Sequence, residues 1–212
     1  MFQRFLHRFV ANPWIYDLVQ CIAGSEKTYQ NLMPYLAQTD NLIVLDIGAG
    51  TGNLAQILPR SAKYLWMDCD TKKLEGFKAK NLSGLAILGD ATKIPLKDKS
   101  VDYAICIAVT HHLSDTELDI LFSEIARVIR LKLIFLDAVE HKESIISNIM
   151  WRYDRGSHPR QGQYICSAIK SYFEVEHLEH YKIYHHYLMC IGIPKADRTL
   201  ITEKQDVSKI IL

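Results

Sequence analysis

The chain has 212 residues, of which 49% are hydrophobic and 23% are charged, and its formal net charge is +1. This composition is that of an ordinary globular protein, which argues against a disordered or fibrous chain. The length suits a single domain, 1–212, built around one large core. Nucleic-acid-binding proteins usually carry a clear basic excess, so the near-neutral charge disfavours nucleic acid as a partner.

The compartment is predicted from the cysteines and from the hydropathy of the chain. Uncharged stretches such as 103–114 are too short to span a bilayer, so we expect no integral membrane segment. Five widely spaced cysteines without a C-x-x-C pair favour a reducing compartment, the cytoplasm. The first ten residues have apolar positions at helical spacing but lack the features of a secretory signal. A helix docked on the domain is the favoured interpretation, and a membrane-surface helix is the alternative.

Apolar runs alternate with helical patterns through the middle of the chain. Residues 1–40 are predicted to form a helical N-terminal cap. Strands are expected at 42–45, 64–67, 85–88, 102–108 and 133–136. Helices are expected after each of the first two strands and behind the capping box at 114–117, with the first helix closed early by Pro59. This alternation predicts an α/β fold with a doubly wound, mostly parallel sheet, whose cofactor-binding core is 41–140.

The last third of the chain has a different pattern. Residues 141–172 are predicted to form helices and a loop on the substrate side. Residues 173–195 read as two strands of an antiparallel hairpin that closes the sheet.

A glycine-rich loop follows the first predicted strand. Gly48, Gly50 and Gly52 alternate there, and glycine allows both a tight turn and the close approach of a ligand. The position is the carboxyl edge of the sheet, where open α/β sheets bind ligands. A dinucleotide fingerprint needs a glycine where Asn53 stands, and the Gly-Lys-Ser/Thr of a P-loop is absent. The loop therefore does not favour a pyrophosphate.

Three aspartates stand at the ends of successive predicted strands. Asp46, beside the glycines, would repel a pyrophosphate and suits a ligand with an ammonium group. Asp68 ends the second strand, where a carboxylate can accept hydrogen bonds from both ribose hydroxyls. Asp90 ends the third, where a carboxylate can accept from an adenine amino group. Each alone fits a helix cap or a surface acid, but the three with the glycine loop form a specific constellation.

This constellation resembles the class I S-adenosylmethionine-dependent methyltransferases. The residues that carry the resemblance lie at 44–53, 66–70, 89–103, 106–113 and 126–130. Within that superfamily the chain looks most like the group that includes the ubiquinone and menaquinone biosynthesis methyltransferases. The resemblance implies a Rossmann-like sheet of seven strands, one of them antiparallel. The family commonly has a Lys-Pro-Gly-Gly turn before the fifth strand, and this chain lacks it.

The resemblance also implies which residues hold the cofactor, S-adenosyl-L-methionine, whose product is S-adenosyl-L-homocysteine. The glycine loop would hold its methionine part, Asp68 its ribose and Asp90 its adenine. The stretch from Ile107 to His111 would lie beside the methyl group. The residues predicted to bind the cofactor are Asp46, Gly48, Ala49, Gly50, Gly52, Asn53, Asp68, Cys69, Asp90, Ala91 and Ile107.

Methyl transfer from a sulfonium needs mainly alignment of the nucleophile and exclusion of water. A general base is needed only when the acceptor must lose a proton. His111, His112 and Tyr16 are the catalytic candidates, although either histidine could instead hydrogen-bond the loop backbone.

The acceptor is expected to contact Tyr16, Trp14 and Trp151, which lie in segments that the family uses as a lid, and His158, which lies in the loop 154–160. Ordinary packing is the alternative interpretation of the aromatic residues. Arg155 and Arg160 lie in the same loop as His158. They could bind an anionic substrate group, but a solvated loop is slightly preferred.

The function predicted is methyl transfer to an oxygen, nitrogen or carbon atom of a small molecule, by a monomer or homodimer. An RNA or protein methyltransferase, supported by a run of lysines at 72–99, is one alternative. A non-catalytic cofactor-binding subunit is another. The histidines at 177, 180, 185 and 186 look like a metal cluster, but 177 and 180 should face opposite sides of a strand, so no metal site is expected.

Overall fold

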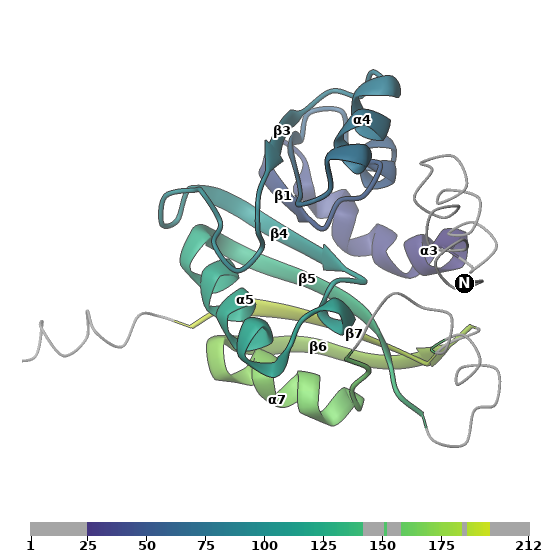
Figure 1. Cartoon of the computed structure of the whole chain (residues 1–212), viewed down its shortest axis with the longest axis vertical. Coiled ribbons are helices and arrows are strands. Elements are labelled where there is room, and N and C mark those ends of the chain that lie inside the picture. The colour runs from purple at the N-terminus through teal and green to yellow at the C-terminus, as the bar shows by residue number, and fades with distance from the viewer. Residues whose placement is uncertain (1–24, 142–150, 152–157, 184–185, 196–212) are drawn as a thin grey trace, which may run out of the picture.

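The computed structural model describes residues 25–141, 151, 158–183 and 186–195. Its centre is a seven-stranded sheet with the order β3-β2-β1-β4-β5-β7-β6 (Figure 1). The strands are β1 (Ile43–Ile47), β2 (Lys63–Asp68), β3 (Leu85–Leu88), β4 (Val101–Ile107), β5 (Ile129–Val139), β6 (Phe173–Lys182) and β7 (His186–Pro194). Strands β1 to β5 pair in parallel, and β7 is antiparallel to both of its neighbours. The predicted doubly wound α/β sheet with an antiparallel hairpin strand is confirmed.

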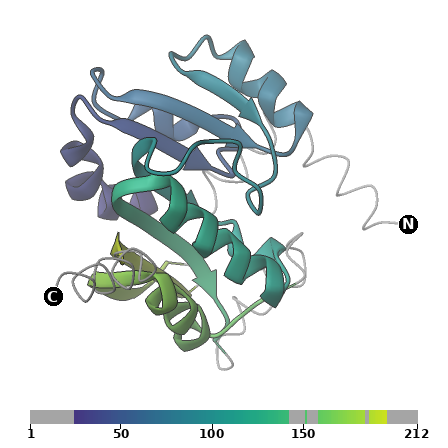
Figure 2. The ribbon, with the colours of Figure 1, turned by 90° about the vertical axis from the view of Figure 1, so that its left-hand side faces the viewer.

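Helices cover both faces of this sheet. The α-helices with described bounds are α3 (Ser25–Leu36), α4 (Thr71–Ala79), α5 (Asp115–Val128) and α7 (Gly162–Tyr172). Helices α5 and α7 lie side by side on one face (Figures 1 and 2). Buried residues of α3 and α4, Leu32 and Phe77 among them, belong to the core of the opposite face.

The central strands are apolar because both of their sides are buried. In β1, Leu45 packs into the core beneath α5 and Val44 into the core of the other face, and both are fully buried. Such strands have no solvent-facing side, so they read as continuous hydrophobic runs. Polar groups can then reach solvent only where a strand ends. The edge strand β3 differs, since Leu85 is 70% exposed.

One local feature departs from the sequence prediction, and a second follows from the turn that the sequence lacks. The helix expected after the glycine loop is only the 3-10 turn η2 (Asn53–Gln56), because the segment before Pro59 is too short for a full helix. The missing turn before the fifth strand leaves α5 continuous with β5, which begins directly after Val128. A β-bulge follows at this junction, where Val101 pairs with Ile129 but Tyr103 pairs with Lys132.

Within the described part of the chain, no helix is both long and apolar enough to cross a membrane.

The capping box at the start of α5 can be tested by mutation. The Ser114 hydroxyl accepts from the Glu117 amide at 3.4 Å, and the Glu117 carboxylate accepts from the Ser114 amide at 2.8 Å. We expect Ser114→Ala to lower the free energy of unfolding by about 1 kcal/mol, because an end amide of the helix loses its acceptor. Urea denaturation would measure the change. The exposed neighbour change Thr116→Ala is the control and should shift stability by less than about 0.5 kcal/mol; equal effects would contradict the capping role.

Candidate functional site

The glycine loop is fastened to the second strand by its backbone. The Ala49 amide donates to the Met67 carbonyl at 3.0 Å, and the indole of Trp66 donates to the Gly50 carbonyl at 2.8 Å. Gly48 has a φ of +68°, and a Cβ built there would lie 2.4 Å from a methyl of Val109. No side chain fits between this turn and the end of β4, so the loop backbone itself forms the surface.

Asp68 ties this loop to the end of β2. One carboxylate oxygen accepts from the Gly50 amide at 2.9 Å and the other from the Asp70 amide at 2.9 Å. Two fixed amides hold the carboxylate in one orientation at the sheet edge. Each carboxylate oxygen has a second acceptor position, so the group can still receive two hydroxyl donors of a ligand.

Asp90 follows β3 on the same edge. Its carboxylate is exposed and accepts from the Thr92 amide and the Thr92 hydroxyl, both at 2.8 Å. The hydrogen bond from the Thr92 amide, with that from its hydroxyl, holds the pKa of Asp90 below its usual value. The carboxylate is thus ionised and ordered. Since β3, β2 and β1 are neighbours, the structure brings Asp90, Asp68 and the glycine loop together at one edge.

The smaller predicted cofactor residues lie around these groups. Cys69 is exposed at the end of β2, while Ala91 and Ile107 are half-buried after β3 and at the end of β4. Asn53, at the far end of the loop, accepts from the Lys80 ammonium at 2.6 Å. Lys80 also donates to Thr51 at 2.9 Å, so it anchors the second half of the loop.

Asp46 is buried, unlike the other two aspartates. Its side chain is on the sheet face that carries Tyr64 and Trp66, and it accepts from the Tyr64 hydroxyl at 2.5 Å. Burial raises its pKa to about 7; the Tyr64 hydrogen bond opposes this rise and the charge of Asp68 adds to it. A cation bound beside the glycine loop would favour the ionised form.

His111 is held by a buried carboxylate that the sequence prediction missed. Its Nδ1 lies 2.7 Å from one oxygen of Asp137, which is fully buried in β5. The other oxygen accepts from the Thr110 amide at 2.7 Å and from the Thr110 hydroxyl at 2.6 Å. Burial opposes ionisation of Asp137, but His111 and the Thr110 donors together hold its pKa below the usual value. An ionised Asp137 therefore fixes the imidazole through its Nδ1–H.

Two of the other predicted residues, His112 and Trp151, lie beside His111. His112 is exposed, with its ring centre 4.1 Å from that of His111. The ring of Trp151 meets His111 edge-on at 5.7 Å. Trp14, Tyr16 and Arg155 lie outside the described residues. The structure thus brings Trp151 and both histidines together at the end of β4.

Arg160 has a role that neither sequence interpretation anticipated. It is 8% exposed, so the prediction of a solvated loop is wrong at this residue. Its guanidinium donates to the Thr110 and Leu113 carbonyls at 2.7 and 2.5 Å and to the Asp115 carboxylate at 2.8 Å. These hydrogen bonds occupy the guanidinium and fix the loop between β4 and α5. The amide of the nearby His158 donates to the His111 carbonyl at 3.0 Å, which fixes the same loop from outside.

Comparison with known proteins finds similarity over the middle of the chain. Residues 44–132, which span the glycine loop, Asp68, Asp90 and His111, match the methyltransferase domain family. This part of the chain is thus similar to methyltransferase domains. The predicted resemblance to class I S-adenosylmethionine-dependent methyltransferases is confirmed.

Relatives and solved structures agree with this similarity. An uncharacterized methyltransferase of Geobacillus kaustophilus is 27% identical over 135 residues, which are 61% of this chain and 63% of that protein. The demethylmenaquinone methyltransferase of Thermotoga maritima is 32% identical over 99 residues, 44% of this chain and 43% of that protein. The chain thus spans less than two thirds of the length of these two relatives.

A solved structure supports the same fold. The magnesium protoporphyrin IX methyltransferase of Synechocystis with bound S-adenosylhomocysteine superposes with a TM-score of 0.66 at 17% identity, over 81% of this chain and 84% of that one.

The buried Asp46 makes the stability of the ligand-free protein depend on pH. In the unfolded chain this carboxyl has a pKa near 3.9, whereas in the folded protein it is about 7. Between these values the unfolded state releases the proton and the folded state keeps it, so rising pH favours unfolding. We expect Asp46→Asn, which cannot titrate, to gain roughly 3 kcal/mol relative to wild type between about pH 5 and pH 8.

Urea unfolding of both proteins at the two pH values measures this difference, in which all other titrating groups cancel. A pH-independent difference would show that Asp46 is already ionised in the folded protein.

Proposed function

We propose that this protein is an S-adenosylmethionine-dependent methyltransferase that acts on a small molecule. The observation that carries the proposal is the single edge formed by the glycine loop, the fixed Asp68 carboxylate and Asp90, inside the matched domain. The named activities of the relatives agree with it. The near-neutral charge supports a small acceptor over a nucleic acid.

The residues present fit this cofactor. The loop backbone between Gly48 and Gly52 would lie against its methionine part, with Asp46 supplying negative charge for the ammonium. The fixed carboxylate of Asp68 would accept the two ribose hydroxyls, and Asp90 with the Ala91 backbone would contact the adenine. When bound, the cofactor supplies a methyl group already activated on a positively charged sulfur. Trp151 would help to exclude water beside His111, since its ring lies 5.7 Å away.

We further propose that His111 accepts the proton of the acceptor. Because the Asp137 carboxylate takes the Nδ1–H, the proton-accepting nitrogen of the imidazole is Nε2. Asp137 is therefore a positioning residue, and its ionised state stabilises the imidazolium that forms. His112 is exposed and is therefore the weaker candidate.

Cofactor binding tests the first part of the proposal. Asp68→Ala should weaken S-adenosylmethionine binding by at least tenfold in calorimetry, because two hydrogen bonds to a charged acceptor are lost. Glu75→Ala, an exposed acid in α4, is the matched control and should bind as wild type does. Wild type that binds no cofactor, or an Asp68→Ala variant with unchanged affinity, would refute the assignment.

Turnover tests the role of His111. We expect His111→Gln to lower kcat by about 100-fold for an acceptor that must lose a proton, with cofactor affinity unchanged. Formation of S-adenosylhomocysteine over a panel of hydroxyl and amine acceptors would measure it. His177→Gln, on β6 away from this edge, serves as the control. Equal rates in the two variants would exclude a catalytic role, and cofactor binding without turnover in wild type would favour a non-catalytic subunit.

A further inference from the structure

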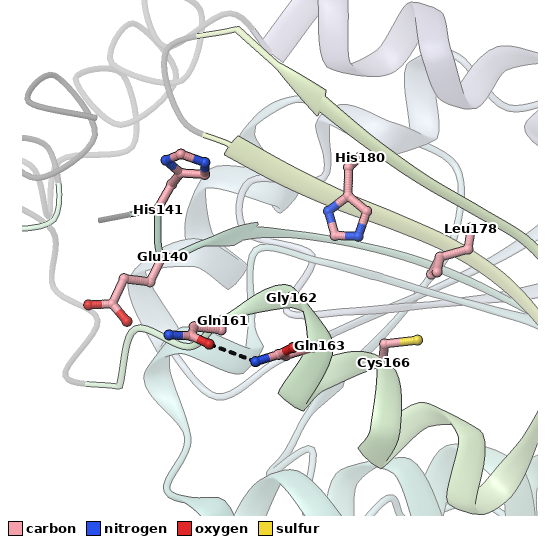
Figure 3. A pocket seen from close by; sticks show the side chains of 8 residues that line it. All are labelled: Glu140, His141, Gln161, Gly162, Gln163, Cys166, Leu178 and His180. Carbon is pink, nitrogen blue, oxygen red and sulfur yellow. Dashed lines mark hydrogen bonds between the residues drawn. The ribbon is translucent and has the colours of Figure 1, made fainter. Parts of the chain in front are cut away.

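Two neighbouring pockets open where β5 ends and α7 begins. The first has a volume of about 590 Å³ and the second about 710 Å³, the size range of small-molecule sites. Both are lined by Glu140, Gln161 and Gln163. Figure 3 shows the Glu140 carboxylate at the first pocket, with Gln161 and Gln163 joined by a hydrogen bond of 2.9 Å. Because they share these residues, the two pockets can hold parts of one ligand.

The pockets are on the acceptor side of the proposed reaction site. Strand order places β4, which ends before His111, between the glycine loop of β1 and the end of β5. Residues 158–160 connect the two places: the His158 amide donates to the His111 carbonyl at 3.0 Å, and the Arg160 carbonyl accepts from the Glu140 amide at 2.7 Å. Neighbouring strands are about 5 Å apart. The carboxyl ends of β4 and β5 are therefore adjacent, and an acceptor long enough to span both would reach from His111 to Glu140.

The pocket walls contain two carboxylates, Asp115 and Glu140, and they differ in whether a cation is paired with them. Asp115 forms an ion pair with Arg160, whose remaining donors are taken by backbone carbonyls, so this pair contributes no net charge. Among the described residues, no ion pair or side-chain hydrogen bond involves the carboxylate of Glu140. Neither pocket is lined by a described lysine. Among the described lining residues, Glu140 thus carries a negative charge that no ion pair offsets.

We propose that these pockets bind the part of the methyl acceptor that carries a cationic nitrogen, with Glu140 as its counter-ion. The side chains of Leu178 and Cys166 line the first pocket and Tyr164 lines the second, so a hydrocarbon or aromatic body has apolar contacts on either side. An acidic acceptor would meet Glu140 without a compensating cation. The inference rests on the proposed methyltransferase function and specifies its substrate class: a small amine.

Three probes that share a hydroxyphenyl ring test this charge preference: tyramine, the neutral alcohol tyrosol and 4-hydroxyphenylacetate. Each is titrated by NMR at about pH 8 into the full chain saturated with S-adenosylhomocysteine. We expect tyramine to bind at least fivefold more tightly than tyrosol, and the carboxylate to bind most weakly. Glu140→Gln, which keeps the shape, should weaken tyramine binding five- to tenfold and leave tyrosol unchanged.

Glu174→Gln, at the opposite end of the hairpin, is the matched control and should bind all three probes as wild type does. Binding of the carboxylate as tight as that of the amine, an unchanged tyramine affinity in Glu140→Gln, or binding of none of the probes would overturn the proposal. Failure of the proposed function is seen separately, as wild type that does not bind S-adenosylhomocysteine in calorimetry before any probe is added.

Discussion

The parallel pairing of β1 with β2 and β4 is the constraint on which the rest of the structure depends. These strands are buried on both faces, so a polar group is costly anywhere along them except at the ends. Parallel pairing then puts all of the carboxyl ends on one edge. The glycine loop, Asp68 and the His111 loop are neighbours for this reason, although Gly48 and His111 are 63 positions apart in the sequence. The site is thus a product of sheet topology before any ligand is considered.

The two buried aspartates show how the number of donors decides the state of a carboxyl group. Asp46 has the Tyr64 hydroxyl as its donor, which is too little to offset burial, and its pKa rises. Asp137 receives hydrogen bonds from Thr110, His111 and its own neighbour Ala138, and its pKa falls. Both carboxyls are buried, but the pKa of Asp46 is raised and that of Asp137 is lowered, because Asp137 has more donors. In the proposed function, the first lies beside the cationic part of the cofactor and the second orients an imidazole.

Much of the fold could be predicted from the sequence, because local patterns encode it directly. The apolar strands, the capping box at Ser114 and the glycine loop each depend on a few adjacent residues. The contacts of Asp137 and Arg160 could not be predicted in this way. Asp137 meets His111 only because Ile107 pairs with Leu136 across two strands, and Arg160 is buried only because the chain returns over Thr110. Such contacts depend on register and on chain path, which local spacing does not reveal.

The bulge at the start of β5 has a consequence for how this domain can vary during evolution. Side chains alternate between the two faces of a strand, so one residue more or fewer there would turn Asp137 to the other face of the sheet. Because α5 leads into β5 without a loop, the bulge is the place where such a change can be taken up. A change of length between Val128 and Asp137 therefore needs a compensating change at the bulge to keep Asp137 facing His111. Changes of length after β5 do not alter this register, so they leave the contact between Asp137 and His111 in place.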